Sequence, residues 1–91
     1  MAFRANPDCI VCSYGDGIAV LNRKTSDYFS LDPVGATVWE AIEAAPQSGV
    51  TSDEVVSIVV DRFDVEPDTC RPDILAFFDM LKDARLIEKA S

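Results

Sequence analysis

The fold is decided by the segment Tyr28-Phe29-Ser30-Leu31-Asp32-Pro33-Val34-Gly35-Ala36-Thr37-Val38-Trp39-Glu40-Ala41-Ile42. Its first four residues predict a short strand. Asp32 is placed to cap the N–H groups that begin a helix, and Pro33 suits the first helical position because the donor it lacks has no partner there. Gly35 and Trp39 then fall one turn apart on the same face. A strand that leads directly into a capped helix is typical of a small α+β domain.

Two more strands are predicted before this segment. Cys9–Tyr14 and Ile18–Leu21 are rich in β-forming residues, and the Gly-Asp-Gly sequence between them is a turn signal, so the two runs predict a hairpin. The polar stretch Asn22–Asp27 would return the chain into the third strand, Tyr28–Leu31. The result is an antiparallel meander. Met1–Pro7 carries no periodicity and is expected to be loose or extended.

Helices are expected in the rest of the chain. The first would cover Pro33–Ala44 and end before Pro46, because the residue before a proline avoids helical geometry. Thr51 and Glu54 have the spacing of a capping box, which predicts the start of a second helix that continues to Phe63.

The second helix is predicted against its composition, because Val55–Phe63 is rich in β-branched residues. A period of two fits badly, since positions of both parities hold apolar and polar residues. On a helical wheel one side carries Val55, Val56, Ile58, Val59, Val60 and Phe63. The other side carries Asp53, Glu54, Ser57, Asp61 and Asp64.

A third helix is predicted from about Thr69–Pro72 to Ala84, after a linker at Val65–Asp68. One face of this helix holds Ile74, Phe77, Phe78 and Leu81. Leu86-Ile87 would tuck against the core. The order predicts a single α+β domain over residues 1–91, with a winged helix-turn-helix-like architecture in which a three-stranded antiparallel sheet is followed by three helices that cover one face of it.

Length and composition exclude several classes of protein. A chain of 91 residues with 48% hydrophobic residues can bury one core. Its longest apolar run falls short of the roughly 20 residues of a membrane span, and no signal peptide is visible, so we expect a cytoplasmic protein without membrane association. The net charge of −8 repels phosphate backbones and favours a neutral or basic partner.

Few residues of the sequence could take part in catalysis or bind a metal. The sequence contains no histidine, the usual general base and a frequent zinc ligand. Cys9-x-x-Cys12 is half of a metal knuckle without a second half, and Cys70 stands alone, so the cysteines are expected to fill space rather than serve redox or metal chemistry. The carboxylates of the second helix fit a solvated face. We therefore expect no catalytic residues, no metal and no cofactor, and not an enzyme.

The outer strand Tyr28–Leu31 is the remaining candidate for a functional site. Edge strands are usually protected by lysines, prolines or bulges, and this strand has none of them. The strand is either merely short, or covered by the third helix, or open to a peptide that adds as a fourth strand.

The chain resembles the PqqD-like proteins, also called leader-recognition elements of ribosomally made, modified peptides. The resemblance covers roughly Pro7 to Glu88. It is carried by Tyr28-Phe29-x-Leu31-Asp32-x-x-Gly35-x-x-x-Trp39, Thr51-x-x-Glu54, Phe63-Asp64-Val65, Asp73-Ile74-x-x-Phe77-Phe78-x-x-Leu81 and Leu86-Ile87. Arg23-Lys24-Thr25-Ser26 replaces a tight glycine turn and leaves the register of the third strand open by one residue.

The resemblance implies a non-catalytic adaptor, as in pyrroloquinoline quinone or lasso-peptide biosynthesis. Its partners would be the leader of a precursor peptide, bound between the third strand and the third helix, and a modifying enzyme or leader peptidase. We expect the peptide to contact Tyr28, Phe29, Ser30, Leu31, Arg71, Leu75, Phe78, Asp79 and Lys82. Arg71, Leu75, Asp79 and Lys82 lie on one flank, or shoulder, of the buried face of the third helix, and Met80 lies on the other. The sequence leaves open which of the two shoulders faces the sheet.

Two other functions remain as alternatives. A small structural or oligomerising subunit could use the same edge to pair with its own copy, so the protein could be a monomer or a dimer. A winged-helix DNA-binding protein would need a basic third helix. Here Asp68, Asp73, Asp79 and Asp83 outnumber Arg71, Lys82 and Arg85, which argues against nucleic acid as a partner.

Overall fold

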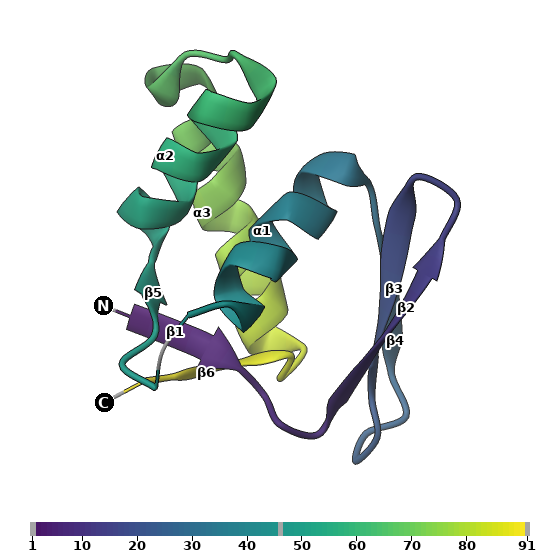
Figure 1. Ribbon diagram of the computed structural model, residues 1–91. Helices are drawn as coiled ribbons and strands as arrows, with labels where there is room; N and C mark the ends of the chain where they lie inside the picture. The colour runs from purple at the N-terminus through teal and green to yellow at the C-terminus, as the bar shows by residue number, and fades with distance from the viewer. Residues whose placement is uncertain (1, 46, 91) are drawn as a thin grey trace.

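The computed structural model describes residues 2–45 and 47–90. The predicted meander is present as β2 (Cys9–Tyr14), β3 (Gly17–Asn22) and β4 (Tyr28–Leu31), which form an antiparallel sheet in the order β2-β3-β4 (Figure 1). Val20 pairs with Val11 on one side and with Phe29 on the other. The strand Tyr28–Leu31 is therefore an edge of this sheet, as the sequence predicts.

A second small sheet ties the two ends of the chain together. It contains β1 (Ala2–Ala5), β5 (Val50–Thr51) and β6 (Ile87–Lys89) in the order β5-β1-β6, and both pairings are antiparallel. Of the two expectations for Met1–Pro7, loose or extended, the structure shows the extended one at Ala2–Ala5, while Met1 lies outside the described residues. Phe3 pairs with both Val50 and Lys89, so distant pairing and not local periodicity creates this strand.

The three helices are α1 (Pro33–Glu43), α2 (Ser52–Phe63) and α3 (Pro67–Asp83). Both predicted caps are confirmed. The Gly35 N–H donates to Asp32 Oδ1 over 2.8 Å, and the Glu54 N–H donates to Thr51 Oγ1 over 3.2 Å while Glu54 Oε1 accepts from the Thr51 N–H over 2.9 Å. The predicted stop at Pro46 lies outside the described residues.

The third helix begins earlier than predicted. Pro67 occupies its first turn, where a missing N–H costs nothing, and Pro72 lies inside it. The linker is therefore only Val65-Glu66, and the predicted start at about Thr69–Pro72 lies at least two residues too late. Proline is favoured in the first turn of a helix, so the sequence allows the helix to begin at either Pro67 or Pro72.

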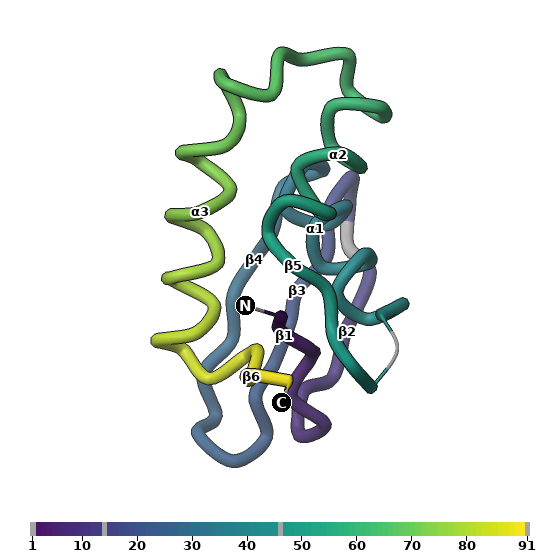
Figure 2. The backbone as a smooth tube through the Cα atoms, turned by 90° about the vertical axis from the view of Figure 1, so that its left-hand side faces the viewer, coloured from purple at the N-terminus to yellow at the C-terminus, as the bar shows by residue number. Residues whose placement is uncertain are grey.

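The helices are not arranged as a single layer over the sheet. Figures 1 and 2 show α1 lying between the β2-β3-β4 sheet and the pair formed by α2 and α3. α1 contacts β3 and β4 on one side and α2 on the other, and α2 packs against α3. The expectation that three helices cover one face of the sheet is thereby corrected: α1 packs against this sheet, while α2 packs against α1 and α3 packs against α2.

The core is built around α1. Trp39 and Ile42 are each 1% exposed, and Val20 of β3, Val55 of α2 and Leu81 of α3 are fully buried with them. Leu86 and Ile87 are buried as expected. Ile58 is the exception on the predicted apolar side of α2, since 38% of it is exposed.

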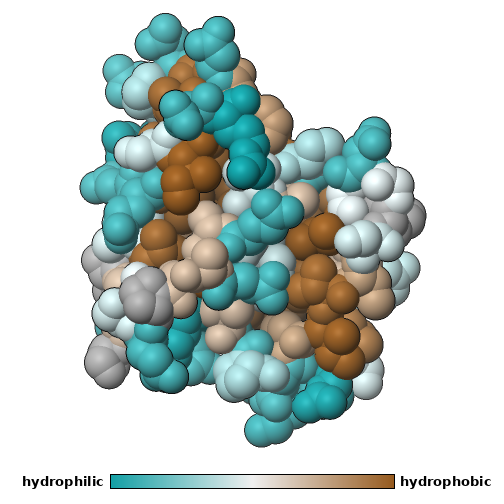
Figure 3. All heavy atoms as spheres, in the orientation of Figure 1, coloured by the Kyte–Doolittle hydropathy of each residue, from teal (hydrophilic) through white to brown (hydrophobic). Residues whose placement is uncertain are grey.

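Apolar side chains also reach the surface. Figure 3 shows apolar atoms over the strands and over the helices. The large hydrophobic residues that are exposed include Ile10, Leu21 and Tyr28 of the sheet, which lie in one row because Leu21 pairs with both neighbours. Among the described helices, none has the length and apolar character needed to cross a membrane.

Candidate functional site

The site begins with the backbone of β4. This strand pairs with β3 only, so one row of its N–H and C=O groups is free of strand partners in the part of the chain that the structure describes. The Asn22 N–H donates to the Asp27 carbonyl over 2.8 Å, which makes this a hydrogen-bonded pair. Hydrogen-bonded and non-hydrogen-bonded pairs alternate along an antiparallel ladder.

The alternation decides which backbone groups point outward. Counting from the Asn22–Asp27 pair, Phe29 and Leu31 bond to β3, while Tyr28 and Ser30 turn their N–H and C=O groups to the free edge. A Cβ placed on Gly17 would collide with the Leu31 carbonyl oxygen, so this oxygen does point toward β3. Two residues of β4 therefore offer backbone groups to a further strand.

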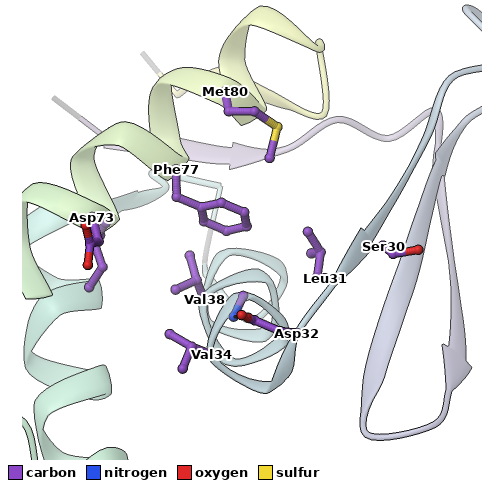
Figure 4. Close-up of a pocket in the computed structure, with 10 residues that line it drawn as sticks. Ser30, Leu31, Asp32, Val34, Val38, Asp73, Phe77 and Met80 are labelled. Carbon is purple, nitrogen blue, oxygen red and sulfur yellow. Dashed lines mark hydrogen bonds between the residues drawn. The ribbon is translucent and has the colours of Figure 1, made fainter.

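A groove of about 500 Å³ runs beside this edge, between β4, the first turns of α1 and α3. It is lined by Ser30, Leu31, Asp32, Val34, Gly35, Val38, Asp73, Ile74, Phe77 and Met80. Figure 4 shows Phe77 and Met80 pointing from α3 toward Leu31 and α1. Most of the lining is apolar, so the groove can take apolar side chains of a bound chain.

Gly35 forms part of the floor of the groove. A Cβ added to this residue would lie 3.2 Å from Leu31 Cβ, 3.3 Å from Asp32 Oδ1 and 3.4 Å from Phe77 Cζ. The missing side chain therefore allows α1 to approach Leu31 of β4 closely and leaves room for the Phe77 ring.

Of the residues predicted on α3, most lie on the shoulder away from the groove. Arg71 pairs with Asp53 of α2, Phe78 is buried with its ring centroid 5.7 Å from that of Phe3, and the Lys82 Nζ lies 5.9 Å from the Phe3 centroid. Neither Leu75, which is 45% exposed, nor Asp79 lines the groove.

The other shoulder faces the groove, through Asp73, Phe77 and Met80. The sequence admits either shoulder, because both flank the buried stripe of Ile74 and Leu81. Only the packing of α3 against α2 and β6 decides between them. Of the predicted site residues, Ser30 and Leu31 line the groove, while Tyr28 and Phe29 lie along the same strand.

The turn before β4 is fixed by a buried side chain that the sequence does not single out. Asn22 is 1% exposed, and its Oδ1 accepts from the Lys24 N–H over 2.9 Å and from the Thr25 N–H over 3.3 Å. Its Nδ2 donates to the Arg85 carbonyl over 2.9 Å. Asn22 thus holds the turn before β4 and joins it to the segment that follows α3, while the pairing of Leu21 with Tyr28 fixes the register of β4.

Among the titratable groups of the described residues, Cys9 has a shifted pKa. Burial raises the pKa of the Cys9 thiol, and the nearby carboxylates of Asp8 and Glu43 raise it further. Within residues 2–45 and 47–90, no group of His, Cys, Asp or Glu is arranged to hold a metal ion. Cys12 is exposed and Cys9 half-buried, which fits their opposite directions on β2.

Comparison with known proteins identifies the family. The family model described as "Coenzyme PQQ synthesis protein D (PqqD)" matches residues 17–87, most of the chain. The chain belongs to the PqqD family. The match begins at β3, so β1 and β2 lie outside it. No curated protein matches the sequence.

Two solved structures share the PqqD-type fold of this chain. "TbiB1 in Complex with the TbiA(beta) Leader Peptide" has a TM-score of 0.80 at 23% identity and covers 97% of this chain and 98% of its own. "Lasso peptide synthetase B1 complexed with the leader peptide" has a TM-score of 0.78 at 19% identity, with 97% and 99% covered. Both likenesses extend over β1 and β2 as well as the helices.

Proposed function

We propose that this PqqD-family protein is a peptide-binding adaptor. It takes up the leader of a ribosomally made precursor peptide as an added strand on β4 and delivers the precursor to a modifying enzyme or leader peptidase. One observation carries the proposal: the outward backbone groups of Tyr28 and Ser30 lie beside an apolar groove of about 500 Å³. The two structures of the same fold, both of which are complexes with leader peptides, support the choice of ligand.

The strand and the groove have different parts in binding. Tyr28 and Ser30 together offer two N–H and two C=O groups, and each hydrogen bond contributes about 0.5–1.5 kcal/mol net. These bonds fix the position and direction of a peptide. Burial of apolar side chains, at about 25 cal/mol per Å², supplies most of the affinity. The groove formed with Phe77 and Met80 therefore determines which peptides bind.

The proposal leaves chemistry to the partner enzyme. The sequence has no histidine, and the one hydroxyl among the residues that line the groove, that of Ser30, makes no hydrogen bond to Asp32 or Asp73 that would pair it with a base. An adaptor needs only to hold a peptide in an extended form that the partner can reach. We expect a cytoplasmic protein, where precursor peptides are made.

A selection experiment with a backbone variant tests the proposal. Short random peptides are selected by display on immobilised wild-type protein, and the enriched peptides are titrated calorimetrically. Ser30→Pro removes an outward N–H at the peptide edge, and Ser13→Pro is the matched control. Ser13 pairs with Ile18, and the same alternation turns its N–H to the free edge of β2.

We expect the enriched peptides to bind wild type and Ser13→Pro equally and to lose most of their affinity for Ser30→Pro, with native circular dichroism in all three proteins. Equal binding to folded Ser30→Pro contradicts strand addition at β4, as does a selection that enriches no peptide. Light scattering without peptide checks the alternative of self-pairing: a dimer that Ser30→Pro dissociates would show that a second copy occupies the edge.

A further inference from the structure

We propose that the groove selects a peptide segment in which an apolar side chain is followed or preceded, two positions away, by a lysine or arginine. The apolar side chain would lie against Phe77 and Met80, and the basic side chain would lie at the end of the groove where Asp73 stands. This inference rests on the proposed function and adds the chemistry of the peptide to it.

The lining of the groove changes in character along α3. Phe77 and Met80 point toward Leu31 of β4, and these three side chains form an apolar section (Figure 4). Asp73 lies one turn before Phe77 on the same shoulder of the helix. Asp32 also lines the groove, beside Leu31, where β4 leads into α1 (Figure 4). The groove thus has an apolar section next to an acidic end at Asp73.

Nothing in the described part of the chain neutralises this acidic end. The cations that form ion pairs are Arg4, Lys24, Arg62, Arg71 and Lys82, and their partners are other carboxylates. Asp32 and Asp73 are both exposed and take part in none of these pairs. With a net charge of −8 on the whole chain, the field at this end attracts a cation.

The spacing of the two sections matches the repeat of a strand. Residues 73 and 77 are four positions apart on a helix, which corresponds to about 6 Å along its axis. Side chains that point to one face of a strand repeat every second residue, about 6.7 Å apart. A peptide that pairs with β4 would therefore place one inward side chain beside Phe77 and the next inward side chain beside Asp73.

Asp73 is the stronger candidate of the two carboxylates. Asp32 is already used as the cap of α1, where its Oδ1 accepts the Gly35 N–H over 2.8 Å, and it stands at the positive end of the helix dipole. Asp73 has no hydrogen-bond partner among those found for the described side chains and is free to turn toward a ligand. We expect Asp73 to contribute most of the preference for a basic side chain.

The test uses the most enriched peptide from the display selection that carries the apolar and basic pair, and a second copy in which glutamine replaces the basic residue. Both are titrated on wild type, Asp73→Asn and Asp79→Asn. Asp79→Asn is the matched control, because it makes the same change of charge on the opposite, exposed shoulder of α3. Asp32→Asn is added as a variant that keeps the cap.

We expect Asp73→Asn to weaken the basic peptide about three- to tenfold and to leave the glutamine peptide unchanged, while Asp79→Asn alters neither. Asp32→Asn should show a smaller effect of the same kind. High salt should reduce the difference between the two peptides on wild type.

Three results would overturn the inference: enriched peptides without a basic residue at this spacing, an equal loss for both peptides on Asp73→Asn, or a larger effect of Asp79→Asn. Each of these leaves the proposed function intact as long as Ser30→Pro still abolishes binding. Binding that survives Ser30→Pro, in contrast, contradicts the proposed function itself.

Discussion

At the scale of single residues, Gly35 connects the sequence motif to the groove. The spacing of Gly35 and Trp39 is visible in the sequence, but the reason for the glycine is not, because the Phe77 ring that lies 3.4 Å from its missing Cβ comes from a distant helix. Trp39 is 1% exposed and lies in the core. One residue of the motif shapes the floor of the groove, and the other supports it.

Gly35→Ala tests the role of the floor. An alanine in α1 gains roughly 0.5–1 kcal/mol of helix stability, which offsets the close contacts with Leu31 and Phe77. We expect a nearly unchanged melting temperature and, because one methyl group shifts the Phe77 ring into the groove, an affinity for the selected peptide that is lower by about tenfold. Unchanged affinity in the folded variant would show that Gly35 does not set the depth of the groove.

Trp39→Ala should act through stability. Removal of this buried side chain leaves a cavity and costs about 3–5 kcal/mol. A small domain has only about 5–15 kcal/mol in total, so the variant would be marginal. Thermal melting with and without saturating peptide checks this: the melting point should fall sharply, and peptide should restore part of it. A native melting point together with lost binding would make Trp39 a contact residue.

The cysteines should differ in reactivity. The raised pKa of Cys9 means that less of it is thiolate at any pH below that pKa, whereas Cys12 is exposed. Iodoacetamide at mildly alkaline pH should therefore modify Cys12 before Cys9, as followed by peptide mass spectrometry. Equal rates at the two positions would mean that Cys9 is not buried as described.

At the scale of helices and strands, the sequence predicts the features that depend on neighbouring residues and misses those that depend on pairing between distant segments. The caps at Asp32 and Thr51 and the hairpin turn depend on neighbours a few residues away, so the sequence shows them. β1, β5 and β6 are short, and Phe3 finds partners at Val50 and Lys89, which no local pattern reveals. The groove-facing shoulder of α3 was undecided for the same reason.

Asn22 is the buried link between the turn before β4 and the segment that follows α3. Asn22→Ala would leave the Lys24 and Thr25 N–H groups without their acceptor and the Arg85 carbonyl with one donor fewer. We expect a loss of about 1–3 kcal/mol in urea denaturation. Asn6→Ala is the matched control, since Asn6 Nδ2 donates to the same carbonyl over 2.8 Å and is exposed there. Equal losses in the two variants would contradict a special role for Asn22.

At the scale of the whole molecule, the position of α1 explains why a groove exists. Because α1 lies between the sheet and the α2–α3 pair (Figure 2), α3 stands off from β4, and the groove of about 500 Å³ lies between them. The sequence predicts the fold class and the free edge. The sequence does not predict the distance between α3 and β4, because that distance depends on how three layers pack. It therefore does not predict which residues of α3 line the groove.

Amide exchange of β4 tests the central claim most directly. In an NMR hydrogen-exchange experiment on the free protein, the Phe29 and Leu31 amides should be protected by β3, whereas the Tyr28 and Ser30 amides should exchange quickly. Saturation with the selected peptide should slow Tyr28 and Ser30 and leave Ser13 of the opposite edge unchanged. Rapid exchange of Tyr28 and Ser30 in the saturated complex would contradict the addition of a peptide strand to β4.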